Sequence, residues 1–210
     1  MAYYPVLIDF EGAACLVAGG GQIALHKARL LAEQGADVTV IAPQILGEIK
    51  ALPVRTELRK VAAEDAEGKM LVVDASGSPE AEELLRAACR RLNIPYNCAG
   101  HGEACTAVFP AVFRRGRTVV AVSSQGASPP ASVWLRDELA AHVPQNMDAV
   151  LDRMAEVRVI SKENFSRQPV RREYLHRCLE KMLESGKILT GSEELEIRNS
   201  IKKEIEEMRK

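Results

Sequence analysis

Short apolar runs alternate with amphipathic stretches along the first half of the chain. The run Ala14–Ala18 leads into three consecutive glycines, and residues 22–34 then place their apolar side chains at helical spacing up to Gly35. A second apolar run, Val38–Ala42, ends at Pro43. Two such runs separated by a helix of this length predict a βαβ unit with parallel strands.

The same alternation continues further along the chain. It predicts a helix at Pro79–Leu92 and strands at Met70–Val73, Ile94–Asn97 and Thr118–Val122. Strands that alternate with helices in this way favour a doubly wound parallel sheet, so the fold class predicted is α/β.

The pattern becomes mostly helical after Ser128. The pair Pro129–Pro130 suits the start of a helix that runs towards Pro144. Amphipathic spacing then predicts three further helices, at Met147–Arg158, Arg171–Ser185 and Ser192–Arg209. A helical tail without a large core of its own more often packs on a second copy, so we expect a homodimer.

The glycine turn is typical of dinucleotide binding. Gly19 permits a sharp turn, Gly21 lets backbone amides approach a pyrophosphate, and Ala24 is small enough for close packing of helix and strand. The alternative is a tight turn that binds nothing. The acidic residue expected after the second strand is missing, because Pro43 and Gln44 stand there. NAD and NADP therefore both stay open, although no arginine is present to favour a 2′-phosphate.

Composition excludes several functional classes. The chain has 210 residues and a formal net charge of −1, which gives no reason to expect nucleic-acid binding. Its five cysteines form no CxxC pair and no close Cys/His array, so we expect reduced thiols and no metal site. The sequence shows neither a signal peptide nor an apolar stretch of membrane-spanning length, which predicts a cytoplasmic protein without membrane contact.

Two polar segments follow predicted strands and are further candidates for chemistry. His101 and Glu103 should lie at the carboxyl edge of the sheet, where either could transfer protons. The alternative for both is a solvated turn. Ser124 precedes a helix and either caps it or binds a ligand, and Arg136 either pairs with a substrate carboxylate or lies in solvent.

Many segments together resemble the precorrin-2 dehydrogenase family, which includes the N-terminal module of siroheme synthase. The resemblance covers about two thirds of the chain and rests on Tyr4–Asp9, Val17–Leu31, Val38–Pro43, Asn97, Cys105, Phe109–Ala111, Ala121–Ser124, Gly126, Ser128–Pro129 and Leu135–Arg136. It implies NAD-dependent oxidation of precorrin-2, a tetrapyrrole, to sirohydrochlorin on the route to siroheme. It also implies a Rossmann domain at residues 1–112, a dimerisation region at 113–146 and a helical domain at 147–210.

The resemblance also implies roles for individual residues. Contacts to the cofactor would come from the glycine turn and from the ends of the next two strands, at Gly19, Gly21, Gln22, Ile23, Pro43, Gln44, Ala75 and Ser76. Contacts to the substrate would come from Asn97, Ser124 and Arg136.

One position departs from the family motif. An aspartate follows Asn-Val-Val in the family and is regarded as the catalytic or chelation-related carboxylate, whereas here Gly100 follows Asn97-Cys98-Ala99. We therefore expect dehydrogenase activity with weak or absent ferrochelatase activity, and a separate chelatase that receives the product. His101, Glu103 or water would take the proton. Two alternatives stay open: a catalytically reduced NAD- or tetrapyrrole-binding carrier or sensor, and a generic Rossmann reductase for another small molecule.

Overall fold

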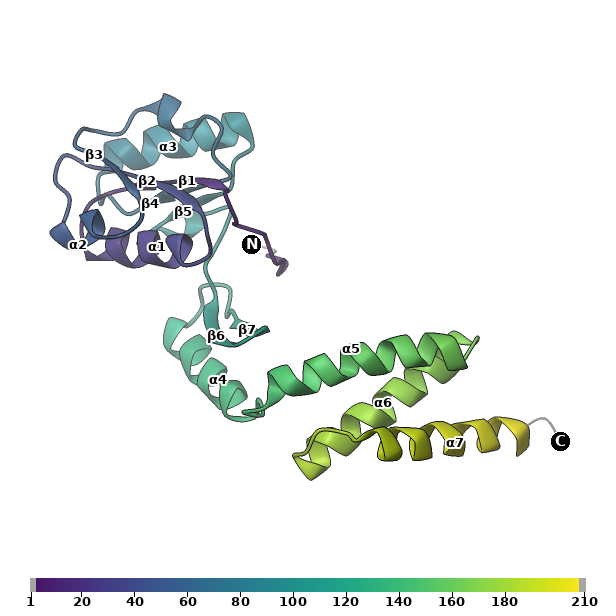
Figure 1. Ribbon diagram of the computed structural model, residues 1–210. Coiled ribbons are helices and arrows are strands. Elements are labelled where there is room, and N and C mark those ends of the chain that lie inside the picture. The colour runs from purple at the N-terminus through teal and green to yellow at the C-terminus, as the bar shows by residue number, and fades with distance from the viewer. Residues whose placement is uncertain (1–2, 208–210) are drawn as a thin grey trace. The chain divides into compact units, whose positions relative to one another are not determined.

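The computed structural model describes residues 3–207, and the chain divides after Phe109 into two compact units (Figure 1). The first unit holds a five-stranded parallel sheet in the order β3-β2-β1-β4-β5. Its elements are β1 (Ala14–Ala18), α1 (Gln22–Ala32), β2 (Asp37–Ile41), α2 (Gly47–Lys50), β3 (Arg55–Glu57), η1 (Ala63–Ala66), β4 (Leu71–Asp74), α3 (Pro79–Leu92), β5 (Tyr96–Cys98) and η2 (Gly102–Ala104). The prediction of an α/β fold with a parallel sheet is confirmed.

Both faces of the sheet are buried. In β1, Cys15 and Val17 join the core beneath α1, whereas Leu16 and Ala18 join the core on the side of α3. Because successive side chains of a strand point to opposite faces, a strand that is apolar at every position needs a helix on each side. Figure 1 shows α1 and α3 on the two faces.

The strand order reverses next to β1. From β1 the chain crosses to β2 on one side, and β4 later pairs with the other side of β1. In open sheets of this kind, ligands bind in the crevice outside the carboxyl ends of the strands at the point of reversal. The loops that follow β1 and β4 therefore frame the candidate site.

The second unit begins with an antiparallel pair and continues as helices. Its elements are β6 (Ala111–Arg115), β7 (Thr118–Val122), α4 (Pro129–Ala141), α5 (Met147–Asn164), α6 (Gln168–Ser185) and α7 (Gly191–Glu207). The predicted strand at residues 118–122 is real, but it pairs with β6 and not with the parallel sheet. For the predicted helix at 192–209, the last two residues lie outside the described part of the chain.

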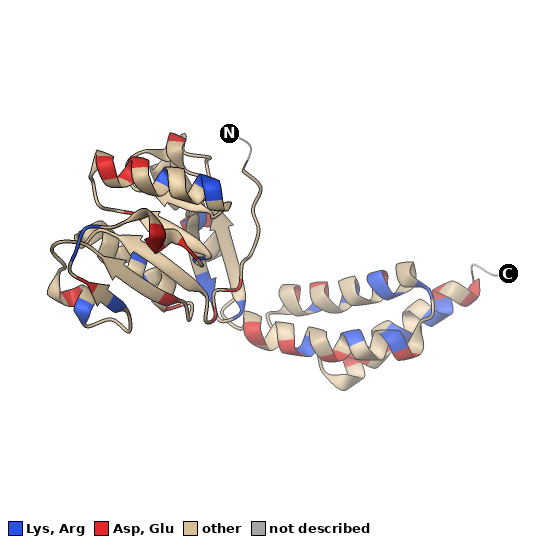
Figure 2. Ribbon diagram, turned by 90° about the horizontal axis from the view of Figure 1, so that it is seen from above, with Lys and Arg blue, Asp and Glu red and all other residues tan. Residues whose placement is uncertain are grey.

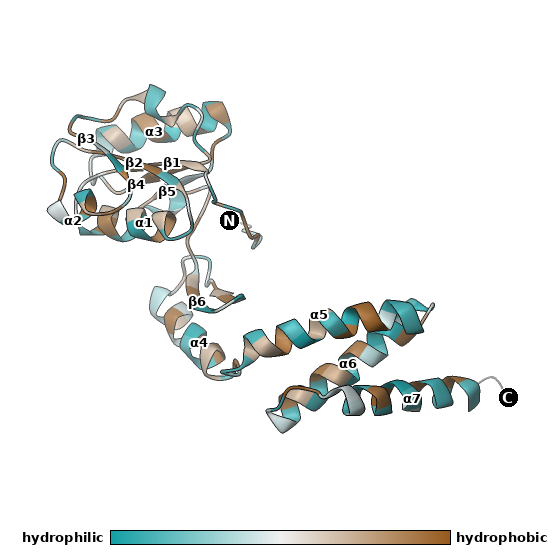
Figure 3. Ribbon diagram, viewed as in Figure 1, coloured by the Kyte–Doolittle hydropathy of each residue, from teal (hydrophilic) through white to brown (hydrophobic). Residues whose placement is uncertain are grey.

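The helices α5, α6 and α7 share a core, contrary to the expectation that this tail lacks one. Its fully or almost fully buried members are Val150, Val157, Phe165, Tyr174, Cys178, Met182, Leu189 and Ile201. Hydrophobic and hydrophilic residues alternate along these helices (Figure 3), and both signs of charge are interspersed on them (Figure 2). Packing of the tail is therefore explained within one chain. The assumption that the tail lacks its own core is wrong, whereas the homodimer itself stays a prediction.

Among residues 3–207, no helix combines the length and the apolar character that a membrane span requires.

Candidate functional site

Three glycines form the turn between β1 and α1, and each meets a different environment. A Cβ on Gly19, whose φ is +119°, would lie 2.3 Å from the carbonyl oxygen of Ala75, and a Cβ on Gly20 would lie 1.9 Å from that of Gln44. A Cβ on Gly21 would meet nothing within 4 Å. Gly19 and Gly20 thus allow the loops after β4 and β2 to pack against the turn, while Gly21 leaves open space in front of α1.

The first turn of α1 is suited to an anion. Its N-cap is Gly21, which offers no side-chain cap, and the first turn contains no acidic residue. The first N–H groups of a helix have no intrahelical acceptor, and the helix dipole adds partial positive charge at this end. The open space at Gly21 and these N–H groups together fit the pyrophosphate of a dinucleotide.

The fold brings all eight predicted cofactor residues to one edge of the sheet. Gly19, Gly21, Gln22 and Ile23 follow β1, Pro43 and Gln44 follow β2, and Ala75 and Ser76 follow β4. Pro43 and Gln44 are exposed, so the position of the usual ribose-binding acid is accessible but carries no carboxylate. Contact between these residues and a cofactor stays a prediction.

Asp74 is a buried carboxylate at this edge that was not among the residues predicted from the sequence. Only 2% of the residue is exposed, and its side chain accepts hydrogen bonds from the Ser76 amide (2.9 Å), the Ser76 hydroxyl (2.6 Å) and the Tyr96 hydroxyl (3.2 Å). Burial raises the pKa of Tyr96 well above its usual value, and the nearby charge of Asp74 raises it further. Asp74 thus fixes the loop after β4 and joins it to β5. The available signal was a charged residue that ends an otherwise apolar strand.

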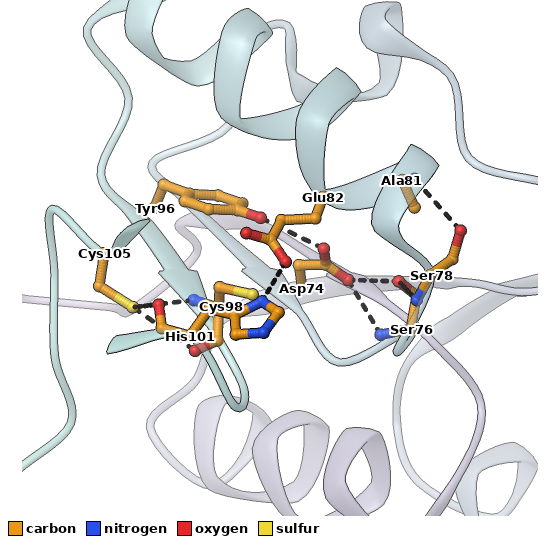
Figure 4. A network of polar contacts seen from close by, with 9 residues as sticks. All are labelled: Asp74, Ser76, Ser78, Ala81, Glu82, Tyr96, Cys98, His101 and Cys105. Carbon is orange, nitrogen blue, oxygen red and sulfur yellow. Dashed lines mark hydrogen bonds and ion pairs between the residues drawn. The ribbon is translucent and has the colours of Figure 1, made fainter. Parts of the chain in front are cut away.

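His101 is held by a partner on α3 (Figure 4). Its Nδ1 lies 2.5 Å from Oε2 of Glu82, and this pairing raises the pKa of His101 and lowers that of Glu82. The histidine side chain is 69% exposed. The sequence indicates His101 as a candidate but not Glu82, because the two residues come together only when α3 packs beside β5.

The other candidates near His101 have different surroundings. Glu103 is exposed on η2 and lies close enough to His101 to add to its raised pKa. Asn97 is buried, and its Nδ2 donates to the carbonyl oxygen of Ala107 over 3.0 Å, so it fixes the segment after η2. Gly100 has φ +106°, and a Cβ there would meet nothing within 4 Å.

The predicted substrate residues Ser124 and Arg136 belong to the second unit and have partners there. The Ser124 hydroxyl donates to the Ser128 carbonyl and accepts from the Ser128 amide, both over 3.0 Å. Arg136 pairs with Asp137 over 2.6 Å. Both side chains thus have local structural partners, and their contact with a substrate stays a prediction.

Comparisons with known proteins agree with this geometry. The chain matches a protein family described as "Putative NAD(P)-binding" over residues 6–111. It is 30% identical over 185 residues to a siroheme synthase of Nitrosomonas eutropha, which covers 86% of this chain and 39% of that protein. It is 36% identical over 148 residues to a siroheme synthase of Pseudomonas entomophila, which covers 69% of this chain and 32% of that protein. The chain therefore spans roughly a third of the length of these curated relatives.

A solved structure is similar over almost the whole chain. It is titled "SirC, precorrin-2 dehydrogenase", and it covers 96% of this chain and 100% of its own with a TM-score of 0.66 and 25% sequence identity. Residues 6–111, which match the protein family, amount to only about half of the chain. A likeness that covers 96% of the chain therefore includes the second unit as well as the first.

Proposed function

Because the chain belongs to the family of precorrin-2 dehydrogenases and of the N-terminal NAD-binding module of siroheme synthases, we propose that it oxidises precorrin-2 to sirohydrochlorin with NAD. The observation that carries this proposal is the glycine turn, which opens onto the uncapped start of α1 at the point where the strand order reverses. NAD is preferred over NADP because Pro43 and Gln44 offer no cation for a 2′-phosphate.

The chain's own residues bind the reactants and move a proton. The N–H groups at the start of α1 hold the pyrophosphate, and Gly21 lets it approach them. When bound, NAD supplies the acceptor for a hydride from a saturated carbon of the macrocycle. Glu82 holds Nδ1 of His101, which leaves Nε2 as the atom that accepts the proton released in the same oxidation. Glu103 on η2 is the second candidate for this proton.

Magnitudes explain why the loss of the family aspartate is tolerable for this reaction. Orientation of bound reactants is worth about 7–11 kcal/mol, whereas one general base contributes 10²–10⁴-fold, or about 3–5 kcal/mol. Metal insertion depends more directly on a base, because two pyrrole protons must leave as the ion enters. We therefore propose that ferrochelatase activity is weak or absent and that a separate chelatase takes the product.

The test of this proposal is turnover by the purified chain. With precorrin-2 and NAD, we expect one NADH for each sirohydrochlorin formed, followed by their absorbance. Binding of both ligands without NADH would favour the alternative, a carrier or sensor. Gly100 is the observation that favours this alternative, since it leaves the loop after β5 without a carboxylate at the family position.

Restoring a carboxylate at position 100 tests the assignment of the missing base. Gly100→Asp has room for its Cβ, although φ +106° makes the backbone strained by roughly 1–3 kcal/mol. We expect cobalt insertion into sirohydrochlorin to rise more than NADH formation does. Gly100→Asn is the matched control, because it carries the same strain without a charge. Two results would refute the assignment. One is an equal rise in cobalt insertion and NADH formation with Gly100→Asp, and the other is a rise in cobalt insertion with Gly100→Asn as large as that with Gly100→Asp.

We also propose that residues 113–146 form a dimerisation region between a nucleotide-binding domain at 1–112 and a helical domain at 147–210. The support is a set of exposed apolar side chains on α4, namely Val133, Trp134, Leu135 and Leu139. Apolar surface of this kind is stabilised when a second copy covers it. The mass of the particle in solution tests the proposal, and a monomer at all concentrations contradicts it.

A further inference from the structure

Three side chains with different donor atoms converge beside the carboxyl end of β5. Glu82 comes from α3, Cys98 ends β5, and His101 lies in the loop that follows (Figure 4). One oxygen, one sulfur and one imidazole nitrogen of these residues all lie within 4.8 Å of one another. The sequence shows no metal-binding array because the three ligands come from separate segments that only the fold brings together.

We propose that Glu82, Cys98 and His101 form a binding site for a single divalent transition-metal ion of the zinc or cobalt class. Thiolate, imidazole and carboxylate are all established ligands of such ions. Tetrahedral coordination with bonds of about 2.0–2.3 Å places ligand atoms roughly 3.3–3.8 Å apart, so shifts of about 1 Å complete the site. Three protein ligands leave a fourth position for water or another small ligand.

The charges near the three ligands together favour binding of a cation. The carboxylate of Asp74 is near enough to raise the pKa of both Cys98 and His101, and it therefore adds negative potential at the site. Arg86 acts in the opposite direction, since it helps to lower the pKa of Glu82. Burial raises the pKa of Cys98 to about 11, so the thiol is protonated without metal. Metal binding replaces the thiol proton of Cys98 and any proton on Nδ1 of His101, and both protons pass to solvent. The metal-bound imidazole then carries its proton on Nε2, so in the metal-bound protein Glu103, the second candidate, accepts the proton of the oxidation.

The ion would be a resident ligand of the loop and not an ion delivered to a macrocycle. Residues 99–104 are otherwise held mainly by backbone bonds, such as that from the Ala99 amide to the Asp74 carbonyl oxygen (2.8 Å). Coordination by Cys98 and His101 would tie both sides of Gly100 to α3. Metal should therefore slow hydrogen exchange in this loop.

The test uses the full chain, stripped of metal, without NAD or tetrapyrrole, so that it does not depend on the proposed dehydrogenase activity. Titration with cobalt(II) should give one equivalent bound, a near-ultraviolet sulfur-to-cobalt band and the intense visible bands of tetrahedral cobalt. Zinc should displace the cobalt. Slower exchange of the amides at residues 99–104 should accompany binding.

Substitutions distinguish metal binding at this site from metal binding at other thiols of the chain. Cys98→Ser should remove the sulfur-to-cobalt band, whereas Cys178→Ala, in the core of the second unit, should retain it. His101→Ala changes an exposed side chain, so it keeps the fold, and it should weaken binding at least about tenfold. Glu82→Gln should also weaken binding, while Glu83→Gln, its exposed neighbour on α3, should not.

Three results would overturn the proposal. They are the absence of a sulfur band in the unaltered chain, its survival in Cys98→Ser, and equal affinity in His101→Ala and the unaltered chain. If Cys98→Ser fails to fold, the exposed His101→Ala variant decides the question alone.

Discussion

Gly19→Ala is expected to destabilise the first unit by about 2–6 kcal/mol and to abolish dinucleotide binding. A non-glycine residue at φ +119° costs roughly 1–3 kcal/mol, and forcing a Cβ to within 2.3 Å of the Ala75 carbonyl oxygen adds an overpacking cost of about 1–3 kcal/mol. Displacing the loop after β4 also moves Ser76 away from the site. Hydrogen exchange of the β1 amides measures the loss, because the sole tryptophan, Trp134, lies in the second unit and does not report on the first.

Two glycine variants separate the contributions to this effect. Gly68→Ala places a Cβ at φ +67° with nothing within 4 Å, so it carries backbone strain without the clash. Gly21→Ala has no atom within 4 Å of its Cβ and should fold normally, yet it should weaken NAD binding because the Cβ occupies the space in front of α1. Normal NAD affinity in Gly21→Ala would contradict the placement of the pyrophosphate.

Asp74→Ala is expected to destabilise the first unit by about 1–3 kcal/mol. The substitution leaves the hydroxyl of Tyr96, a residue only 1% exposed, without its acceptor, and an unsatisfied buried group of this kind costs about 1–3 kcal/mol. The Ser76 amide and hydroxyl lose their acceptor too, so NAD affinity should fall as the loop after β4 loosens. Exchange of the β4 and β5 amides and a calorimetric NAD titration measure the two effects.

A double-mutant cycle checks the reason for this loss. Tyr96→Phe in the Asp74→Ala background removes the unsatisfied hydroxyl and should restore part of the stability. Asp74→Asn keeps the size of the side chain and an acceptor for Ser76, so it should be milder than alanine. If the double variant is less stable than Asp74→Ala alone, the hydroxyl of Tyr96 is not the source of the cost.

Local patterns were sufficient to predict much of the first unit. The helix at residues 79–92 has the predicted bounds, and the structure shows why they are sharp: Ser78 caps the helix and Pro79 occupies its first turn. By contrast, β3 (Arg55–Glu57) is short, polar and partly exposed at the edge of the sheet, so no apolar run marks it. Arg114 and Arg115 interrupt the apolar pattern of β6 in the same way.

The candidate site could likewise be predicted only in part from the sequence. The glycine turn could be predicted because its function depends on backbone geometry within one short segment. The partners of His101 and the burial of Asp74 could not, since Glu82 and Tyr96 reach them from other elements. Sequence spacing carries little information about such tertiary contacts.

The pairing of β1 with β4 also bears on the order in which the chain folds. Cys15 lies opposite Leu71, so the centre of the sheet forms only after a long loop has closed, and such nonlocal pairing slows folding. The sheet is nevertheless complete at Cys98, before any residue of α5, α6 or α7 is needed. On the ribosome, where N-terminal segments emerge first, the nucleotide-binding unit can therefore assemble while the helices are still being synthesised. The helical unit relies on contacts between successive helices and should form rapidly once its last helix is released.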